Sequence, residues 1–119
     1  MAGRLTTHVL DTAHGCPAAY VEVAVWHIVG GSERRLLKTV RTNSDGRTDE
    51  PLLQDDDLIA GCYELVFRVG PYFAVHDDEQ AQLPFLDEVP VRFGIADPTA
   101  YYHVPLLVSP WSYSTYRGS

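Results

Sequence analysis

Apolar and polar side chains alternate along much of this chain, and the alternation has a period of two residues. In the first such segment, Leu5, Thr7 and Val9 would share one face of a strand. β-branched and aromatic residues are frequent in these segments, which favours half-buried strands. The segments with this pattern lie at residues 5–10, 21–26, 62–69, 89–95 and 102–108.

Turn-forming residues separate these segments at short intervals, as in Asn43-Ser44-Asp45-Gly46 and Asp97-Pro98. Only residues 72–83 could hold a helix, and a short one, because the segment lacks a sustained apolar face and meets Pro84. The pattern predicts an all-β, antiparallel sandwich of about eight strands with one short helix.

The length of 119 residues predicts a single domain spanning 1–119. The net charge of −7, without a basic stripe, argues against a nucleic-acid partner. No apolar run approaches the ~18 residues that span a bilayer, and no secretory signal is visible at the N-terminus, so we expect a cytoplasmic protein without a membrane partner. In that compartment Cys16 and Cys62 are both expected to be free, with Cys62 buried.

Two histidines fall on strand faces that point away from the expected core. His103 shares its face with Tyr101, Pro105 and Leu107, and His8 takes the outer face of the first segment. Pro105 cannot donate to a ladder and indicates an irregular or edge position. These outer faces are too apolar to be left in water, so the pattern favours an interface in a homo-oligomer.

A single strand histidine is more often structural than catalytic, and His14, His27 and His76 are interpreted in that way. His8 and His103 are different because other recognition groups accompany them: Arg47 follows a tight Asp-Gly turn, and the chain ends in Tyr-Arg-Gly-Ser. A metal site on the two histidines would lack an obvious third ligand, and there is no phosphate loop or nucleophile elbow. We therefore expect a site without metal or cofactor.

Five stretches carry a resemblance to a known family: LTTHVLDTAHGCPAAYVEV, NSDGRTDEPLL, GCYELVFRVGPYF, PFLDEVPVRFGIAD and YYHVPLLVSPWSYSTYRGS. In this order they resemble the 5-hydroxyisourate hydrolases, the transthyretin-related enzymes of urate breakdown. The resemblance implies a transthyretin-like sandwich of two four-stranded antiparallel sheets, assembled as a homotetramer that is a dimer of dimers. It also implies that the outer face of one sheet, made by the first strand, the strand after the Asp-Gly turn and the last two strands, lines the dimer–dimer interface.

The family motifs assign the site residue by residue. The histidine of TTHVLD is His8, the arginine of DGR is Arg47 and the histidine of YHVPLL is His103, and these three are the expected catalytic residues. His8, Arg47, Tyr116, Arg117 and Ser119 are expected to bind the substrate. The implied reaction is hydrolysis of 5-hydroxyisourate to 2-oxo-4-hydroxy-4-carboxy-5-ureidoimidazoline by a histidine-activated water, with arginine stabilising the developing charge.

A transthyretin-like carrier is the alternative. It would use the same sandwich and tetramer to bind a small aromatic ligand in the central channel. A carrier has no need of His8, Arg47, His103 and the Tyr-Arg-Gly-Ser tail together, which favours the hydrolase.

Overall fold

A computed structural model describes residues 3–76 and 83–118 of the chain. Its strands are β1 (Arg4–Asp11), β2 (Cys16–Pro17), β3 (Glu22–Gly30), β4 (Glu33–Arg41), β5 (Leu53–Gln54), β6 (Gly61–Arg68), β7 (Glu88–Ile95), β8 (Tyr101–Val108) and β9 (Tyr113–Thr115). One α-helix, α1, spans Val69–His76, and a 3-10 turn, η1, spans Asp55–Asp57. Over the described ranges, none of the helical segments has the length and apolar character needed to cross a bilayer.

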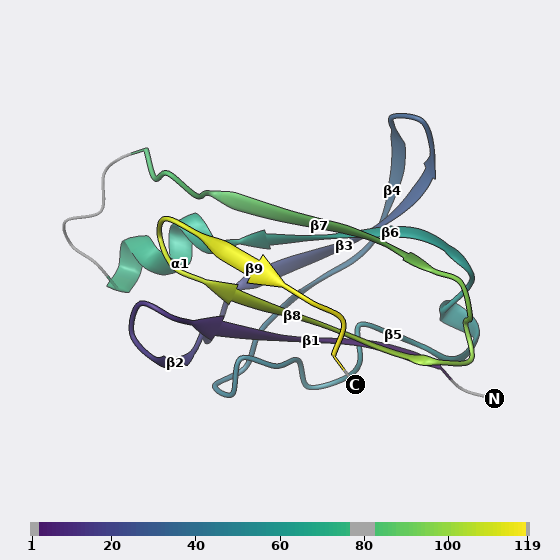
Figure 1. Cartoon of the computed structure of the whole chain (residues 1–119), viewed down its shortest axis with the longest axis horizontal. Coiled ribbons are helices and arrows are strands. Elements are labelled where there is room, and N and C mark those ends of the chain that lie inside the picture. Colours follow the sequence, from purple (N-terminus) through teal and green to yellow (C-terminus); the bar gives the residue numbers. More distant parts are fainter. Residues whose placement is uncertain (1–2, 77–82, 119) are drawn as a thin grey trace.

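The strands form the expected sandwich of two sheets. One sheet has the order β2-β1-β8-β9, with β5 also pairing β1, and the other has the order β4-β3-β6-β7. Figure 1 shows the two layers, with β1 and β8 side by side in one and β3, β6 and β7 in the other. The first sheet has five strands rather than four, because the two-residue strands β2 and β5 each pair with β1.

The pairing of β1 with β8 differs from the expected antiparallel arrangement. These strands run parallel, from Arg4 opposite Tyr101 to Asp11 opposite Val108. The chain reaches β8 from β7, which lies in the other sheet, so β8 enters beside the start of β1 and runs in the same direction. Alternation reveals which side chains share a face but carries no information on strand direction.

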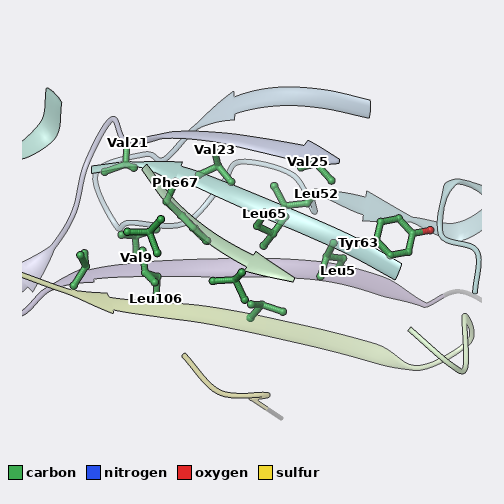
Figure 2. Packing of buried hydrophobic residues seen from close by; sticks show 14 of the residues in the cluster. Leu5, Val9, Val21, Val23, Val25, Leu52, Tyr63, Leu65, Phe67 and Leu106 are labelled. Atoms are coloured by element: carbon green, nitrogen blue, oxygen red, sulfur yellow. The ribbon is translucent and has the colours of Figure 1, made fainter. Parts of the chain in front are cut away.

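The core lies between the sheets and follows the period-two pattern. Leu5 and Val9 of β1 are fully buried against the side chains of the opposing sheet, such as Leu65 and Phe67 of β6. Figure 2 shows these side chains pointing toward one another between the layers. Burying a side chain of this size contributes about 1.5–3 kcal/mol, so the interleaved faces hold the sheets together.

The helix lies earlier than the segment 72–83 predicted for it. It begins at Val69, and the backbone N–H groups of Val69 and Gly70 both donate to the carbonyl of Asp87 at 2.9 Å. Pro71 is tolerated because N–H groups in a first helical turn have no partner within the helix. Residues 77–82 of the predicted helix lie outside the described residues.

Both cysteines are free, as expected. Cys16 is exposed, while Cys62 is half-buried rather than buried. Cys62 lies on the outward face of β6 opposite Gly94, which has no side chain to cover it.

Candidate active site

The parallel pairing of β1 and β8 brings Thr6 and His103 together on the outer face of the first sheet. They are register partners, and the Thr6 hydroxyl lies 2.8 Å from Nδ1 of His103 in a hydrogen bond. His8 lies one outward position farther along β1, opposite Pro105. Both histidines are half-buried, as expected for side chains on a sheet face.

The turn before β5 is docked against β1 and carries Arg47 to this face. The carbonyl of Gly46 accepts the Val9 N–H at 2.8 Å, and the carbonyl of Asp45 lies 2.9 Å from Nε2 of His8. Gly46 has φ of +76°, and a Cβ there would collide with the Val9 carbonyl, so both conformation and contact require glycine. Asn43 closes the turn, since its side-chain oxygen accepts the N–H groups of Asp45 and Arg47 at 2.9 and 3.2 Å.

His103 lies in an electropositive setting. Burial lowers the pKa of His103 below its ordinary value, and the neighbouring Arg47 and His8 lower it further. The imidazole is therefore neutral near pH 7 and able to accept a proton. A hollow of about 260 Å³ opens beside it, lined by Arg4, Thr6, Arg47, Tyr101, Tyr102 and His103. The structure thus brings His8, Arg47 and His103 together on one face of the first sheet.

The C-terminal tail runs along β8 and returns to His103. Strand β9 pairs with β8 from Tyr113 to Thr115, and Gly118 then donates its N–H to the His103 carbonyl at 2.7 Å. Gly118 lies opposite His103, where an uninterrupted β9 ladder would place it, so the register is kept across the gap. In Figure 1 this tail (yellow) lies along β8.

Pro105 explains the gap in this ladder. β8 has β1 on one side and β9 on the other, so it is not the edge strand that Pro105 suggested. The irregularity lies in the ladder itself, because β9 ends at Thr115, opposite Leu106, and proline has no N–H to continue the pairing. The Thr115 hydroxyl donates instead to the carbonyl of Pro105 at 2.7 Å.

The side chain of Arg117 lies apart from the histidines. Arg117 donates to the Tyr101 carbonyl at 3.2 Å and its guanidinium lies 4.2 Å from the centre of the Tyr102 ring. Because Tyr102 and His103 alternate along β8, the side chain of Arg117 lies on the side of the strand away from His103. Tyr116 is exposed and lines a groove with Phe93 of β7. Ser119 lies outside the described residues.

A second polar cluster lies where β1 ends, and the sequence analysis missed it. Asp11 is 1% exposed, and its carboxylate accepts hydrogen bonds at 2.7 Å from both the Tyr72 hydroxyl and Nδ1 of His14. It also accepts the N–H groups of Ala13 and His14 at 3.0 Å. Burial alone would raise the pKa of Asp11, but the hydrogen bonds from Tyr72 and His14 outweigh it and hold the pKa below its ordinary value. The only signal in the sequence is a carboxylate at the inward position of an alternating strand.

Among residues 3–76 and 83–118, no three His, Cys, Asp or Glu side chains lie close enough together to hold a metal ion. The site around His103 instead consists of imidazole, guanidinium and hydroxyl groups, from His8, His103, Arg47 and Thr6. Such a set can move protons and stabilise negative charge.

Comparisons with known proteins place the whole chain in one group. The model of the HIUase/Transthyretin family matches residues 5–118. A 5-hydroxyisourate hydrolase of Halalkalibacterium halodurans is 54% identical over 119 residues, which cover 100% of both chains. The structure of Klebsiella pneumoniae 5-hydroxyisourate hydrolase is similar with a TM-score of 0.80 and 31% identity, covering 98% of this chain and 99% of that one. The structure of transthyretin from Sparus aurata has a TM-score of 0.85 at 25% identity, covering 97% of this chain and 96% of that one.

Proposed function

This chain belongs to the HIUase/Transthyretin family, and from that premise we propose that His8, Arg47 and His103 are the residues with which it hydrolyses 5-hydroxyisourate. Its full-length identity of 54% to a named hydrolase establishes the activity, and the fold agrees with it. The observation that carries the assignment of residues is that His103 lies beside Arg47 in the hollow on the outer sheet face, where burial and Arg47 lower its pKa.

His103 is the proposed base. Its Nδ1 is held by Thr6, which leaves Nε2 to take a proton from water. The water oxygen attacks the C6 carbonyl of the substrate, and the C6–N1 bond then breaks. The proton held by the imidazole is returned to N1, so that one water is consumed and the enzyme is regenerated.

Arg47 and His8 have supporting roles in this mechanism. Arg47 supplies a fixed positive charge for the oxygen that becomes negative at C6, a contribution of roughly 3–4 kcal/mol to the barrier for one well-placed donor. The Asp45 carbonyl accepts a hydrogen bond from Nε2 of His8, which leaves Nδ1 as the nitrogen that can accept one from water or substrate.

The tail residues are proposed to close the site. Tyr116 and Ser119 would hydrogen-bond the substrate ring. Arg117 was also expected to bind substrate, but its contacts with Tyr101 and Tyr102 favour a role in anchoring the tail.

We further propose a homotetramer, a dimer of dimers, with the outer face of the β1–β8 sheet at the dimer–dimer interface. Apolar side chains on this face support the proposal, since Tyr101 is 57% exposed and Leu10 and Leu107 are only half-buried in the single chain. Native mass spectrometry measures the assembly directly, and a monomer at working concentration would contradict the proposal. A cytoplasmic location stays a prediction.

The activity is tested by generating 5-hydroxyisourate in place with urate oxidase and following its ultraviolet absorbance. We expect decay to accelerate in proportion to the protein added. Arg47→Ala should slow the catalysed decay by roughly 10²–10³-fold. Arg35→Ala is the matched control, because Arg35 is an exposed arginine on β4 in the other sheet.

An unchanged decay with intact wild-type protein would contradict the hydrolase and favour the carrier, which a screen of aromatic ligands would then test. Equal rates for Arg47→Ala and Arg35→Ala would leave the activity standing and remove Arg47 from the mechanism.

A further inference from the structure

The penultimate residue of the chain lies against the His103 ring more closely than any side chain would allow. A Cβ added to Gly118 would lie 2.7 Å from Cδ2 of His103 and 3.3 Å from its Cβ and Cγ. The Gly118 backbone cannot move away from the ring without breaking a hydrogen bond, because its N–H donates to the His103 carbonyl at 2.7 Å. The φ angle of Gly118 is not in the left-handed region, so the close contact, and not the backbone conformation, is what requires glycine here.

The other side of the ring is held by Thr6. Its hydroxyl lies 2.8 Å from Nδ1 of His103, and the pair is partly buried between β1 and β8. Within the described residues, Nε2 of His103 has no hydrogen-bond partner. The imidazole is thus held at Nδ1 and packed along Cδ2, with Nε2 left open.

We propose that Thr6 and Gly118 are positioning residues that hold the His103 imidazole in one orientation and present Nε2 to the substrate. This inference rests on the proposed function of His103. The glycine of the Tyr-Arg-Gly-Ser tail would act sterically, by packing against the His103 ring. Thr6 would act on proton transfer indirectly, through its hydrogen bond to His103.

The hydroxyl partner suits a group that must both take and return a proton. A threonine hydroxyl donates to a bare Nδ1 and accepts from Nδ1–H, so it supports either tautomer of the neutral ring. A carboxylate can only accept, and it would favour Nδ1–H and the charged imidazolium. Thr6 therefore fixes the orientation of the ring while leaving its protonation free to change during turnover.

The glycine is tested with Gly118→Ala in the full chain. The added methyl group must push the ring or the tail aside, and a misplacement of about 1 Å at a reacting group costs roughly 10²-fold in rate. We expect that loss in kcat, with KM little changed, because Gly118 acts on the reaction through the orientation of the His103 ring. Gly30→Ala is the matched control, since a Cβ at Gly30 meets nothing within 4 Å and should leave kcat unchanged.

Thr6 is tested with Thr6→Val, which keeps the shape and removes the hydroxyl, and with Thr6→Ser, which restores it. We expect kcat to fall about tenfold in Thr6→Val and to recover in Thr6→Ser. The ¹⁵N chemical shifts of the His103 ring should change in Thr6→Val and return toward wild type in Thr6→Ser, a signature that loss of packing alone would not give.

Two outcomes overturn the proposal: Gly118→Ala matching Gly30→Ala in kcat, or Thr6→Val with wild-type ring shifts and wild-type kcat. Failure of the proposed function is distinguishable, because it would show as a wild-type protein that does not accelerate 5-hydroxyisourate decay. In that case the ring shifts of Thr6→Val and Gly118→Ala still report whether these residues hold the imidazole.

Discussion

Two residues of strand β1 each hold a histidine, one near the start of the strand and one at its end. The groups that hold the two histidines differ, and the difference favours a role in reactivity for one and a role in stability for the other. Thr6 holds His103 through a hydroxyl at 2.8 Å, and Asp11 holds His14 through a carboxylate at 2.7 Å. The distances are nearly the same. The Asp11 carboxylate, however, is buried and fully hydrogen-bonded, whereas His103 keeps one nitrogen open beside a hollow.

The surroundings of Asp11 and of His103 favour opposite charge states: the ionised form of Asp11 and the uncharged form of His103. Hydrogen bonds keep Asp11 ionised in the folded state, and this favours a fixed network that ties β1 to α1 through Tyr72. Burial and the neighbouring Arg47 hold the pKa of His103 below its ordinary value, and this favours a base that is ready near neutral pH. We therefore expect the Asp11 cluster to govern folding and the His103 cluster to govern turnover.

The largest expected effect is on turnover. His103→Ala should lower kcat/KM by roughly 10²–10⁴-fold, the usual contribution of a general acid–base group, with little change in the thermal midpoint. His14→Ala is the matched control, because His14 is 45% exposed and should cost about 1 kcal/mol of stability or less while leaving kcat/KM intact. The two variants are compared by the absorbance assay and by thermal unfolding, and similar activity losses in both would remove the contrast.

The next largest effect is on stability. Asp11→Ala removes the acceptor of four hydrogen bonds and leaves the Tyr72 hydroxyl without its partner, which should lower the free energy of unfolding by about 3 kcal/mol. Urea unfolding followed by circular dichroism measures the loss. The folded fraction should retain the wild-type kcat, and a large fall in kcat at full folding would show that the two clusters are coupled.

A smaller effect isolates one bond of that network. Tyr72→Phe removes only the hydroxyl that donates to Asp11 and should cost about 1.5 kcal/mol in the same urea experiment. Tyr63→Phe is the control, because the Tyr63 hydroxyl donates to the Ile59 carbonyl and accepts the Ile59 N–H, and neither partner is charged. Tyr63→Phe should therefore cost less than Tyr72→Phe, and the reverse order would contradict the importance of the carboxylate.

The smallest effect is a shift along the pH axis. Because the pKa of His103 is lowered in the folded state, its ring should titrate below about 6.5, and the stability that it contributes should fall as the pH drops through the unfolded-state pKa. Arg47→Gln removes the positive charge of Arg47 and should raise the pKa of His103. NMR titration of the ring in both proteins measures the shift, and an equal or lower value in Arg47→Gln would contradict the electrostatic explanation.

Much of the fold was predictable because burial alternates along the strands. The inward positions of β1 and of β7 follow directly from the order of apolar residues. Strand β4 was not anticipated, because as an edge strand it carries exposed arginines, such as Arg34 and Arg35, that hide the alternation. The parallel direction of β8 could not be predicted, since it depends on the crossover from the other sheet.

The site was predictable where a residue carries its own chemistry. His8, Arg47 and His103 stand out by side-chain type and by the family resemblance. Thr6 and Gly118 do not, because their roles come from register: each matters only through its position opposite or against His103. The side on which the Arg117 side chain lies could not be predicted for the same reason. It depends on how side chains alternate in the tail that follows the last strand.

Pro105 has a consequence for the spacing of residues in the C-terminal tail. By ending the β8–β9 ladder it leaves residues 116 and 117 outside regular pairing, yet Gly118 meets His103 in the register that β9 began. The number of residues between Thr115 and Gly118 is therefore fixed by the register of the tail on β8. Inserting a single residue between Thr115 and Tyr116 would place Arg117 where only glycine fits and reverse the face on which its side chain lies. The spacing of this tail is thus constrained as tightly as the identity of its residues.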